Sequence, residues 1–404
     1  MVGGQKTISD QIRNIQDVRA SRVICFITSD RPGLSANMGM MHADALRHIY
    51  DLARATWAKE KRKKLDIFIY TRGGDSDVPW ALMSMLREVI GPKAQLDVLI
   101  PYRCHSAGTI SALGADSIVM GPKAELGPID TTMNSQYNPP HPKTGEPLPI
   151  SVEDVLGYFS LLERVGCTGS DSKVEGLKEF TQKVHPYALG MVQRLEDQTK
   201  LVAGQMLESR LEPFSSAENE AIVSTLAKRI NSHRHSISRT EAVRQIGLKN
   251  IVQAEELKLQ DILWDLFLTY EQKLDLPTTF YPENDFWIDD DLEDKEYVGL
   301  PCCFVETELS AKVCKFDVRM KRVREPMESL TIQPQISFPA PILPVGVDMG
   351  QITQIIQDWY TQVAPNLMKQ SVADVVAKAK KSTATIGFKR TEIRRRWEDA
   401  PVNA

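Results

Sequence analysis

Residues 65–80 read LDIFIYTRGGDSDVPW, and residues 96–116 read LDVLIPYRCHSAGTISALGAD. Each stretch begins with a short apolar run of the kind that forms a buried strand, then passes through a glycine-containing loop into a helical pattern. Apolar strands that alternate with amphipathic helices form βαβ units, whose strands pair in parallel beneath the packed helices. The sequence therefore predicts an α/β fold.

The same alternation extends on both sides of these two stretches. Strands are expected at 22–28, 65–71, 96–101 and 117–120, and helices at 39–58, 77–90 and 106–114. From 151 to 275 the pattern becomes helical. Ser215 with Glu218 and Ser238 with Glu241 have the spacing of a capping box, which marks a helix start, and Gly247 suits a helix end.

The C-terminal part differs in composition, and we predict a boundary near residue 275 that separates domain 1–275 from a smaller mixed α+β module, 276–404. The module is expected to contain an acidic linker at 282–296, a hairpin from 297–306 and 311–323, a helix at 350–380 and a basic tail at 378–396. A solvated and partly disordered end is the simplest interpretation of that tail. The alternative is contact with nucleic acid or another acidic partner.

Composition excludes several classes of protein. The chain has 404 residues, a formal net charge of -4 and 25% charged residues, so it is neither a disordered segment nor a polyanion-binding protein as a whole. Its six cysteines show no CxxC or metal-ligand spacing, which favours a reducing cytoplasm and predicts no metal or cofactor. The sequence shows no signal peptide and no membrane span, and we expect a soluble protein.

Both glycine-containing loops follow the carboxyl ends of predicted parallel strands, where α/β proteins place their active sites. Gly73 and Gly74 allow a sharp turn that exposes backbone N–H groups. Ser106 stands where a strand turns into a helix, so its hydroxyl can act as a nucleophile beside the N–H of Ala107. The simpler interpretation is that Ser106 caps the helix.

Motifs along the chain resemble the serine dehydrogenase proteinase family, a group related to Clp-type and signal-peptide-peptidase-type serine proteases. They read YTRGGDSDVPW, PYRCHSAGTISALGADSIVM, ELGPID, PISVEDV, VHPYALG and SHRHSISRTEA, in that order, and extend over about residues 15–260. The resemblance implies a crotonase-like fold of repeated βαβ units and a homo-oligomeric serine endopeptidase that acts on proteins or peptides. It also implies Ser106 as nucleophile and an oxyanion hole at Gly74 and Ala107.

The general base is the least defined part of the predicted site. Clp proteases carry a histidine in the segment that here reads GPIDTT, where Asp130 and Thr131 stand instead. The candidates are His185, which enters a helix, and His233, which is followed by Arg234 where the family favours aspartate. Lys123 or Lys143 in a Ser–Lys dyad is the alternative.

Other polar residues near the two loops have structural interpretations. We expect Arg72 to be a paired structural charge, Cys104 to be buried and His105 to point away from Ser106. Two rival functions remain: an acyl-CoA-type enzyme of the same fold, which also uses paired backbone N–H groups, and a scaffold without catalytic activity. The missing histidine and Arg234 favour the scaffold. The serine turn favours acyl transfer to a serine, as in the endopeptidase, because the acyl-CoA-type enzyme does not need a serine.

Overall fold

The computed structural model describes residues 7–60, 62–129, 132–133, 135–140, 148, 150–229, 235–325, 341–362 and 364–401. The chain forms two compact units. The first comprises residues 1–280, 299–316 and 395–404, and the second comprises 281–298 and 317–394. The units are interleaved along the chain, and the predicted division into domains at residue 275 stays a prediction.

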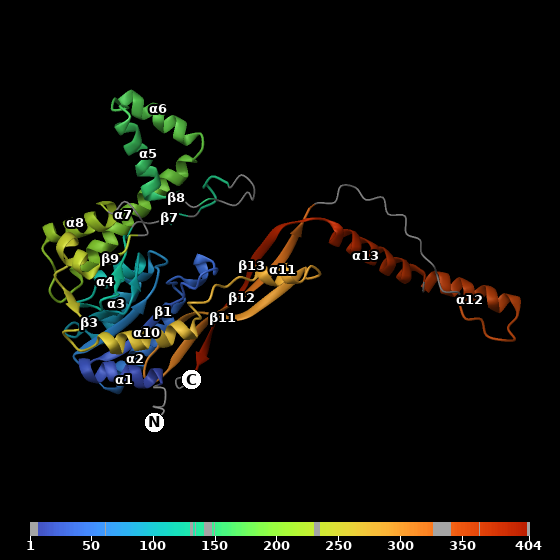
Figure 1. Cartoon of the computed structure of the whole chain (residues 1–404), viewed down its shortest axis with the longest axis horizontal. Helices are drawn as coiled ribbons and strands as arrows, with labels where there is room; N and C mark the ends of the chain where they lie inside the picture. The colour runs from blue at the N-terminus through green and yellow to red at the C-terminus, as the bar shows by residue number, and fades with distance from the viewer. Residues whose placement is uncertain are drawn as a thin grey trace. The chain divides into compact units, whose positions relative to one another are not determined.

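A parallel sheet forms the centre of the first unit (Figure 1). Its parallel strands are β1 (Arg22–Thr28), β2 (Lys64–Tyr70), β3 (Gln95–Ile100), β5 (Ile118–Met120) and β10 (Ile251–Gln253). The first four agree with the predicted strands to within one residue at each end. The predicted α/β fold is therefore confirmed, with β11 (Asp294–Glu306) added antiparallel beside β1.

Helices cover both faces of this sheet. On one face, α1 (Ile8–Arg19) and α10 (Gln260–Lys273) bury a continuous apolar core against β1 and β2. Strand side chains alternate between faces, so the remaining strand residues point to the opposite face, where α2 (Ala45–Lys59) packs beside α3 (Val78–Ile90). The sequence prediction lacked α1, which begins at Thr7 with a capping box to Asp10.

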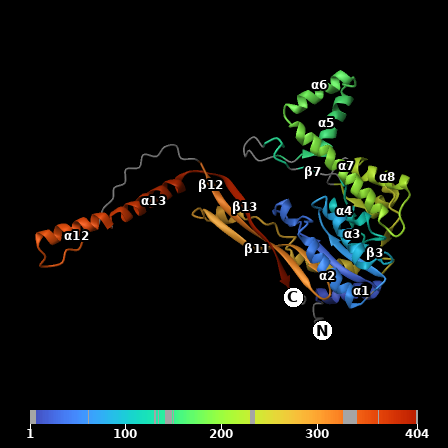
Figure 2. The same ribbon diagram turned by 180° about the vertical axis from the view of Figure 1, so that it is seen from behind.

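The remaining helices of the first unit follow the second glycine-containing loop. They are α4 (Ala107–Leu113), α5 (Val152–Arg164), α6 (Ser170–Thr181), α7 (Pro186–Glu208), α8 (Ser216–Ser224) and the short α9 (Arg239–Glu241). Figure 2 shows that α7 runs from the α5–α6 pair toward α8. The capping box predicted at Ser215 and Glu218 is present. Ser238 caps α9, and Gly247 ends the following turn with a φ of 90°.

Short strands complete this unit. β4 (Arg103–Cys104), β6 (Glu125–Leu126) and β9 (Ile237–Ser238) form a three-stranded sheet, and β7 (Thr132–Met133) pairs with β8 (Ile150–Ser151). β4 lies between β3 and Ser106 in the chain. It pairs with β6, which forms the start of the ELGPID motif. The three-stranded sheet therefore joins three of the motifs on which the family resemblance rests, since β9 lies in SHRHSISRTEA.

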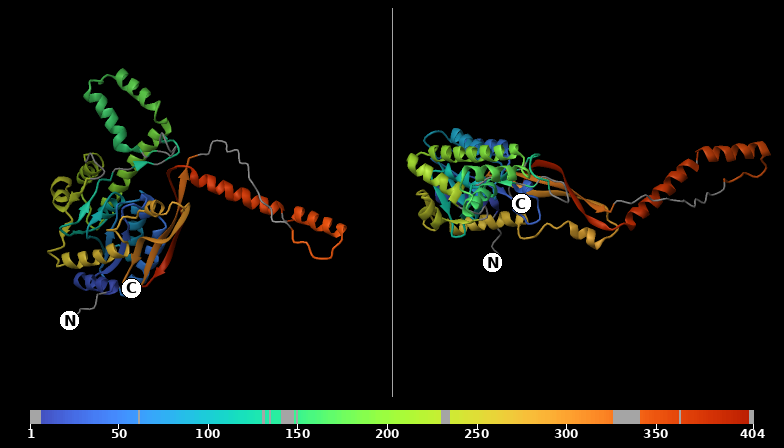
Figure 3. Two further views of the ribbon diagram at one scale, coloured as in Figure 1. Left: turned by 45° about the vertical axis from the view of Figure 1, so that its right-hand side comes forward. Right: turned by 90° about the horizontal axis from the view of Figure 1, so that it is seen from above.

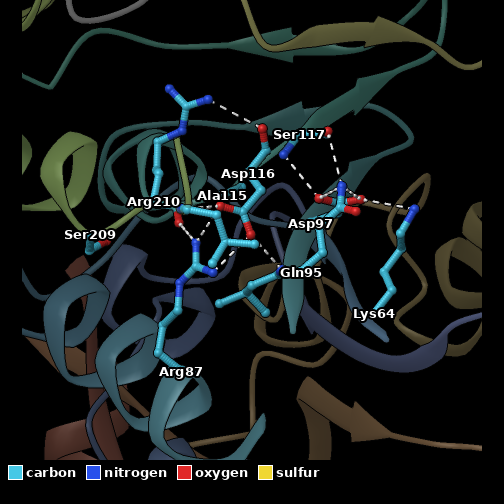
Figure 4. Close-up of polar contacts among 12 residues, drawn as sticks. Lys64, Arg87, Gln95, Asp97, Ala115, Asp116, Ser117, Ser209 and Arg210 are labelled. Atoms are coloured by element: carbon cyan, nitrogen blue, oxygen red, sulfur yellow. Dashed lines mark hydrogen bonds and ion pairs between the residues drawn. The ribbon is translucent and has the colours of Figure 1, made fainter. Parts of the chain in front are cut away.

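A partly buried carboxylate ties the sheet to the helices around it. Asp116 accepts two hydrogen bonds from Arg87 on α3, at 2.8 and 2.9 Å, and one each from the backbone N–H groups of Leu96 and Leu211 (Figure 4). Arg210 donates to the Asp116 carbonyl oxygen. One aspartate thus links β3, α3 and the segment after α7, and these hydrogen bonds fix the three elements relative to one another.

The C-terminal region is more structured than the sequence suggested. It contains α11 (Glu283–Ile288), β12 (Ala311–Arg324), α12 (Met349–Gln362), α13 (Ala364–Ser382) and β13 (Thr385–Ala400). The predicted hairpin is confirmed as β11 and β12, which are neighbours in the large sheet. The predicted single helix at 350–380 is two helices that run end to end (Figure 3), and Pro365 lies in the first turn of the second.

Two expectations for this region were wrong. Residues 282–296 are not a linker, because α11 occupies part of them and Asp285 bonds Lys295 and the Tyr297 hydroxyl. The basic tail is not a partly disordered end, because residues 385–400 form β13 beside β12, although several of its side chains are exposed. The proline-rich segment at residues 333–344 lies mostly outside the described residues. No helix in the described part of the chain is long and apolar enough to cross a bilayer.

Candidate active site

Ser106 sits in a strained backbone conformation at the point where β4 turns into α4. Its φ of 50° and ψ of -115° fall outside the regions that non-glycine residues ordinarily adopt. Such a conformation costs about 1–3 kcal/mol and persists where surrounding structure enforces it, often at functional sites. The Ser106 side chain does not cap α4 by a hydrogen bond. The structure therefore does not support the capping interpretation. The hydroxyl is not occupied by a hydrogen bond to the first turn of α4 and could act as a nucleophile.

The glycine-containing loop after β2 lies directly against this serine. Gly73 has a φ of +115°, and a β-carbon built on it would lie 2.7 Å from the Ser106 β-carbon and 3.2 Å from Oγ. A side chain at position 73 would therefore collide with the serine. Gly74 is equally constrained, since a β-carbon there would lie 2.2 Å from the Met41 carbonyl oxygen.

Backbone pairing orients the Gly74 N–H. Met41 donates to the Gly73 carbonyl at 2.8 Å and accepts from the Asp75 N–H at 3.0 Å, so the segment pairs with Met41 as a parallel strand does. Peptide groups along a strand alternate sides, so the Gly74 N–H points away from Met41. Within the described part of the chain, neither this N–H nor that of Ala107 donates a hydrogen bond.

The two loops together present the elements of an acyl-transfer site. A hydroxyl on a strained turn can attack a carbonyl carbon, and backbone N–H groups without partners can stabilise the oxyanion that forms. Ser106, Gly74 and Ala107 all lie on these two touching loops. Their assignment as nucleophile and oxyanion hole agrees with this placement and remains a prediction.

His105 is buried beside the serine, and its ring faces β6. A β-carbon on Gly127 would lie 3.1 Å from the ring carbon Cγ, and Nε2 is 3.2 Å from Glu125 Oε1. Burial lowers the pKa of His105 to about 4, against the opposing effect of Glu125, so the ring is neutral near pH 7. No hydrogen bond joins it to Ser106 among the described residues, which suits the predicted structural role.

The predicted bases are not found beside Ser106 in the described part of the chain. His185 is exposed and serves as the N-cap of α7, where its Nδ1 accepts the Tyr187 N–H at 3.2 Å and its ring stacks on Tyr137 at 5.1 Å. His233, Arg234, Asp130, Thr131 and Lys143 lie outside the described residues. Lys123 places its Nζ 4.8 Å from the centre of the Tyr102 ring. The base thus remains a prediction.

Polar residues around the loop have the partners expected of structural groups. Arg72 pairs with Asp30, at 3.1 Å, and Asp30 also contacts Arg103 and the Tyr70 hydroxyl. Cys104 is fully buried, and burial raises the pKa of its thiol far above the usual range. That environment disfavours the reactive thiolate and agrees with the expected buried, apolar role of Cys104.

One histidine near the site was missed by the sequence prediction. His42 follows Met41, the residue that pairs with Gly74, and its Nε2 lies 3.7 Å from Asp75 Oδ2. Its Nδ1 lies 3.6 Å from Asp44 Oδ1. The segment MMHADAL gave no signal of this placement, because the histidine reaches the loop only through pairing with a strand more than 30 positions away.

Comparisons with known proteins match the part of the chain that contains the two loops. Residues 4–142 match the family model described as ClpP-like SDH-type serine proteinase, in agreement with the resemblance of the first three motifs, which lie in this segment. The matched segment contains Gly74, Ser106 and Ala107 but neither His185 nor His233. Two uncharacterized proteins of Methanocaldococcus jannaschii are similar, with 34% identity over 22% of this chain and 29% over 30%. The chain spans only 30% and 40% of their lengths.

Two solved structures were also found, both alanine mutants of 1510-N membrane-bound stomatin-specific protease. One shares 11% identity and covers 57% of this chain and 80% of that chain, with a TM-score of 0.33. The other, in complex with a substrate peptide, shares 12% identity and covers 57% and 76%, with a TM-score of 0.32. At these TM-scores neither structure bears on the site or its substrate.

Proposed function

We propose that this chain, whose residues 4–142 match the ClpP-like SDH-type serine proteinase family, is a serine endopeptidase with Ser106 as its nucleophile. The observation that carries the proposal is the contact between Gly73 and the strained Ser106, which brings the hydroxyl and the two glycine-loop peptides together. Strain of this kind is retained where function requires it. The substrate class is a protein or peptide.

The proposed reaction follows the chemistry of acyl transfer. Ser106 Oγ attacks the carbonyl carbon of the scissile bond while a base removes the hydroxyl proton. The oxyanion accepts hydrogen bonds from the N–H groups of Gly74 and Ala107. Collapse of this intermediate expels the amine, which takes the proton from the base, and water then hydrolyses the acyl-enzyme through a second oxyanion.

His185 or His233 supplies the base in this proposal, with a lysine dyad as the alternative. His185 would have to release the Tyr187 N–H and leave the Tyr137 ring before it could accept a proton from Ser106. His233 lies outside the described residues. Arg234 stands beside it where the family favours an acid, so an orienting carboxylate would have to come from elsewhere in the chain.

A scaffold without catalytic activity is the second candidate, and one observation favours it. Among the described residues no side chain hydrogen-bonds to Ser106, and His185 is engaged as a helix cap. An acyl-CoA-type enzyme is the other rival, because the same pair of N–H groups could hold a thioester enolate. Neither rival requires the Ser106 hydroxyl.

Covalent labelling separates these functions. A fluorophosphonate probe is expected to label the folded full-length protein at one site, identified by mass spectrometry as Ser106. Ser106→Ala should abolish the label, while Ser84→Ala, at a serine on α3 whose hydroxyl donates to the Trp80 carbonyl oxygen, should retain it. Folded protein that is never labelled would contradict the proposal and leave the scaffold and the acyl-CoA-type enzyme as the two candidates. Single alanine substitutions of His185 and His233 then identify the base, whose loss should slow labelling by about 10²-fold or more.

The proposal includes assembly of several copies of the chain. Exposed apolar side chains support this, at Leu161 on α5, Val174 on α6 and Val165 just after α5, because exposed apolar surface commonly marks an interface. Sedimentation equilibrium would test it, and a monomer at all concentrations would contradict it. An acidic partner of the tail 378–396 is also part of the proposal, although Arg390 and Arg395 already pair with Glu283 and Asp44 respectively.

A further inference from the structure

Thr71 is a fully buried residue that touches both loops of the candidate site. It follows β2 directly and stands two positions before Gly73. Its backbone bonds to the strand that leads to Ser106: its N–H donates to the Arg103 carbonyl at 2.9 Å, and its carbonyl accepts the His105 N–H at 3.1 Å. The residue is therefore attached to the chain on either side of Cys104, immediately before the serine turn.

The Thr71 hydroxyl acts on the glycine-containing loop. Its Oγ1 accepts the Gly73 N–H at 3.0 Å and lies 3.3 Å from the Gly73 carbonyl, to which it can donate. The Thr28 hydroxyl donates to it at 2.8 Å, and Thr28 is itself fully buried at the end of β1. The two peptide groups of Gly73 are thus held by one side chain whose own orientation is set by a neighbouring strand.

The Thr71 methyl group acts on the serine turn. A β-carbon built on Gly108, in the first turn of α4, would lie 2.5 Å from Thr71 Cγ2. The methyl group therefore packs against the helix backbone two residues after Ser106. One side chain therefore contacts both halves of the site, the glycine-containing loop through its hydroxyl and the first turn of α4 through its methyl group.

We propose that Thr71 is a positioning residue. Its hydroxyl contacts the N–H and the carbonyl oxygen of Gly73, and the Gly74 N–H belongs to the same peptide group as that carbonyl, so Thr71 holds the Gly74 N–H at a fixed place relative to Ser106. Thr28 supports it by fixing the hydroxyl. The inference rests on the proposed endopeptidase function for its catalytic consequence. The positioning itself is a property of the backbone, and hydrogen exchange can measure it separately.

Two substitutions divide the roles of the side chain. Thr71→Val keeps the shape but removes the acceptor, so the Gly73 N–H loses its partner and the loop is free to reorient. Labelling of Ser106 by the fluorophosphonate probe should slow by about 10²-fold, the effect of misplacing a reacting or stabilising group by about 1 Å. Thr71→Ser keeps the hydroxyl and should label within about threefold of the wild-type rate.

A peptide substrate gives the readout that general destabilisation would not move. Thr71→Val should lower kcat while KM changes by less than about threefold, because the lost stabilisation is realised in the transition state. Amide exchange at residues 72–75 should accelerate by about tenfold in the valine variant alone. The matched control is Thr56→Val, which removes a buried threonine hydroxyl bonded to Glu308 at 3.0 Å on another part of the unit. Its labelling rate and loop exchange should match wild type.

The outcomes are distinct. Normal labelling and normal exchange in Thr71→Val would overturn the positioning role and leave the endopeptidase proposal standing. Wild-type protein that is folded but never labelled would end the endopeptidase proposal, and exchange at 72–75 alone would then decide the positioning role. If Thr71→Val fails to fold, Thr28→Val replaces it, with an expected slowing of about tenfold and the same exchange signature. Unchanged labelling and exchange in Thr28→Val would overturn the inference.

Discussion

Gly73 and Ser106 are in direct contact, so that a β-carbon on the glycine would lie 2.7 Å from the β-carbon of the serine. The two residues lie on loops that follow neighbouring parallel strands, β2 and β3. Real β-carbons do not approach this closely, and the contact therefore requires glycine at position 73. It also means that the backbone of one loop forms a wall of the space around the serine hydroxyl.

Gly73→Ala is expected to displace one loop from the other and to reduce labelling of Ser106 by at least about 10²-fold. The control is Gly91→Ala, because Gly91 also has a positive φ, +82°, but open space around its missing β-carbon. That variant should lose about 1 kcal/mol of stability from backbone strain and keep its labelling rate. Equal labelling of both variants would contradict the role assigned to the contact.

Ser106→Gly is expected to be more stable than Ser106→Ala by about 1 kcal/mol, because glycine adopts a φ of 50° without steric cost. Both variants lack the hydroxyl and neither should be labelled. Urea denaturation of the two proteins side by side measures the difference. An alanine variant that is equal or more stable would show that the backbone at this position is not under strain.

Glu306→Gln should change the pH dependence of stability. Glu306 is fully buried, with Oε2 bonded to the Tyr270 hydroxyl at 3.0 Å, and burial raises its pKa to about 7 from an ordinary 4.5. The folded state then binds this proton more tightly than the unfolded state. Its contribution to stability is present below about pH 4.5 and is lost as pH rises through 7.

The glutamine variant has no proton to lose. Its free energy of unfolding relative to wild type should therefore increase by about 1–3 kcal/mol between pH 5 and pH 8.5. Urea denaturation at both pH values gives this difference directly. Parallel pH profiles for the two proteins would show that Glu306 does not titrate in this range.

Asp116→Asn is expected to destabilise the first unit by about 2–4 kcal/mol, because it leaves the largely desolvated Arg87 side chain, 14% exposed, without its carboxylate. Asp51→Asn is the control, since Asp51 pairs with Arg47 at a similar 2.8 Å but on the surface. That variant should change stability by less than about 1 kcal/mol. The two should be compared by thermal denaturation, and similar losses would mean that burial of Asp116 does not strengthen its pair.

Local signals in the sequence predicted much of the fold. Four central strands were placed to within a residue, because each is an apolar run with a turn signal at its end. The capping box at Ser215 and the helix end at Gly247 were also predicted correctly, because each depends on residues only a few positions apart. The α1 helix and β13 were missed. In β13 the charged residues have partners distant in the chain, such as Arg395 with Asp44, so they resembled a solvated tail.

The candidate site was predictable only in part, for the same reason. Paired glycines and a serine after two strands are visible in the sequence, and parallel pairing brings the two loops to one edge. Thr71 gave no such signal, since a threonine at the end of a strand is ordinary. His42 likewise lies in an unremarkable segment, and its approach to Asp75 depends on the pairing of Met41 with Gly74.

The sequence by itself determined the α/β class, the parallel strands and the two loops that carry Gly73 and Ser106, because hydrophobic periodicity and turn residues act over a few positions. Only the tertiary structure decided that Gly73 lies against Ser106, that Ser106 is strained and that Thr71 holds both loops. These relationships depend on the register and twist of neighbouring strands, which are set by packing of the whole sheet and its helices.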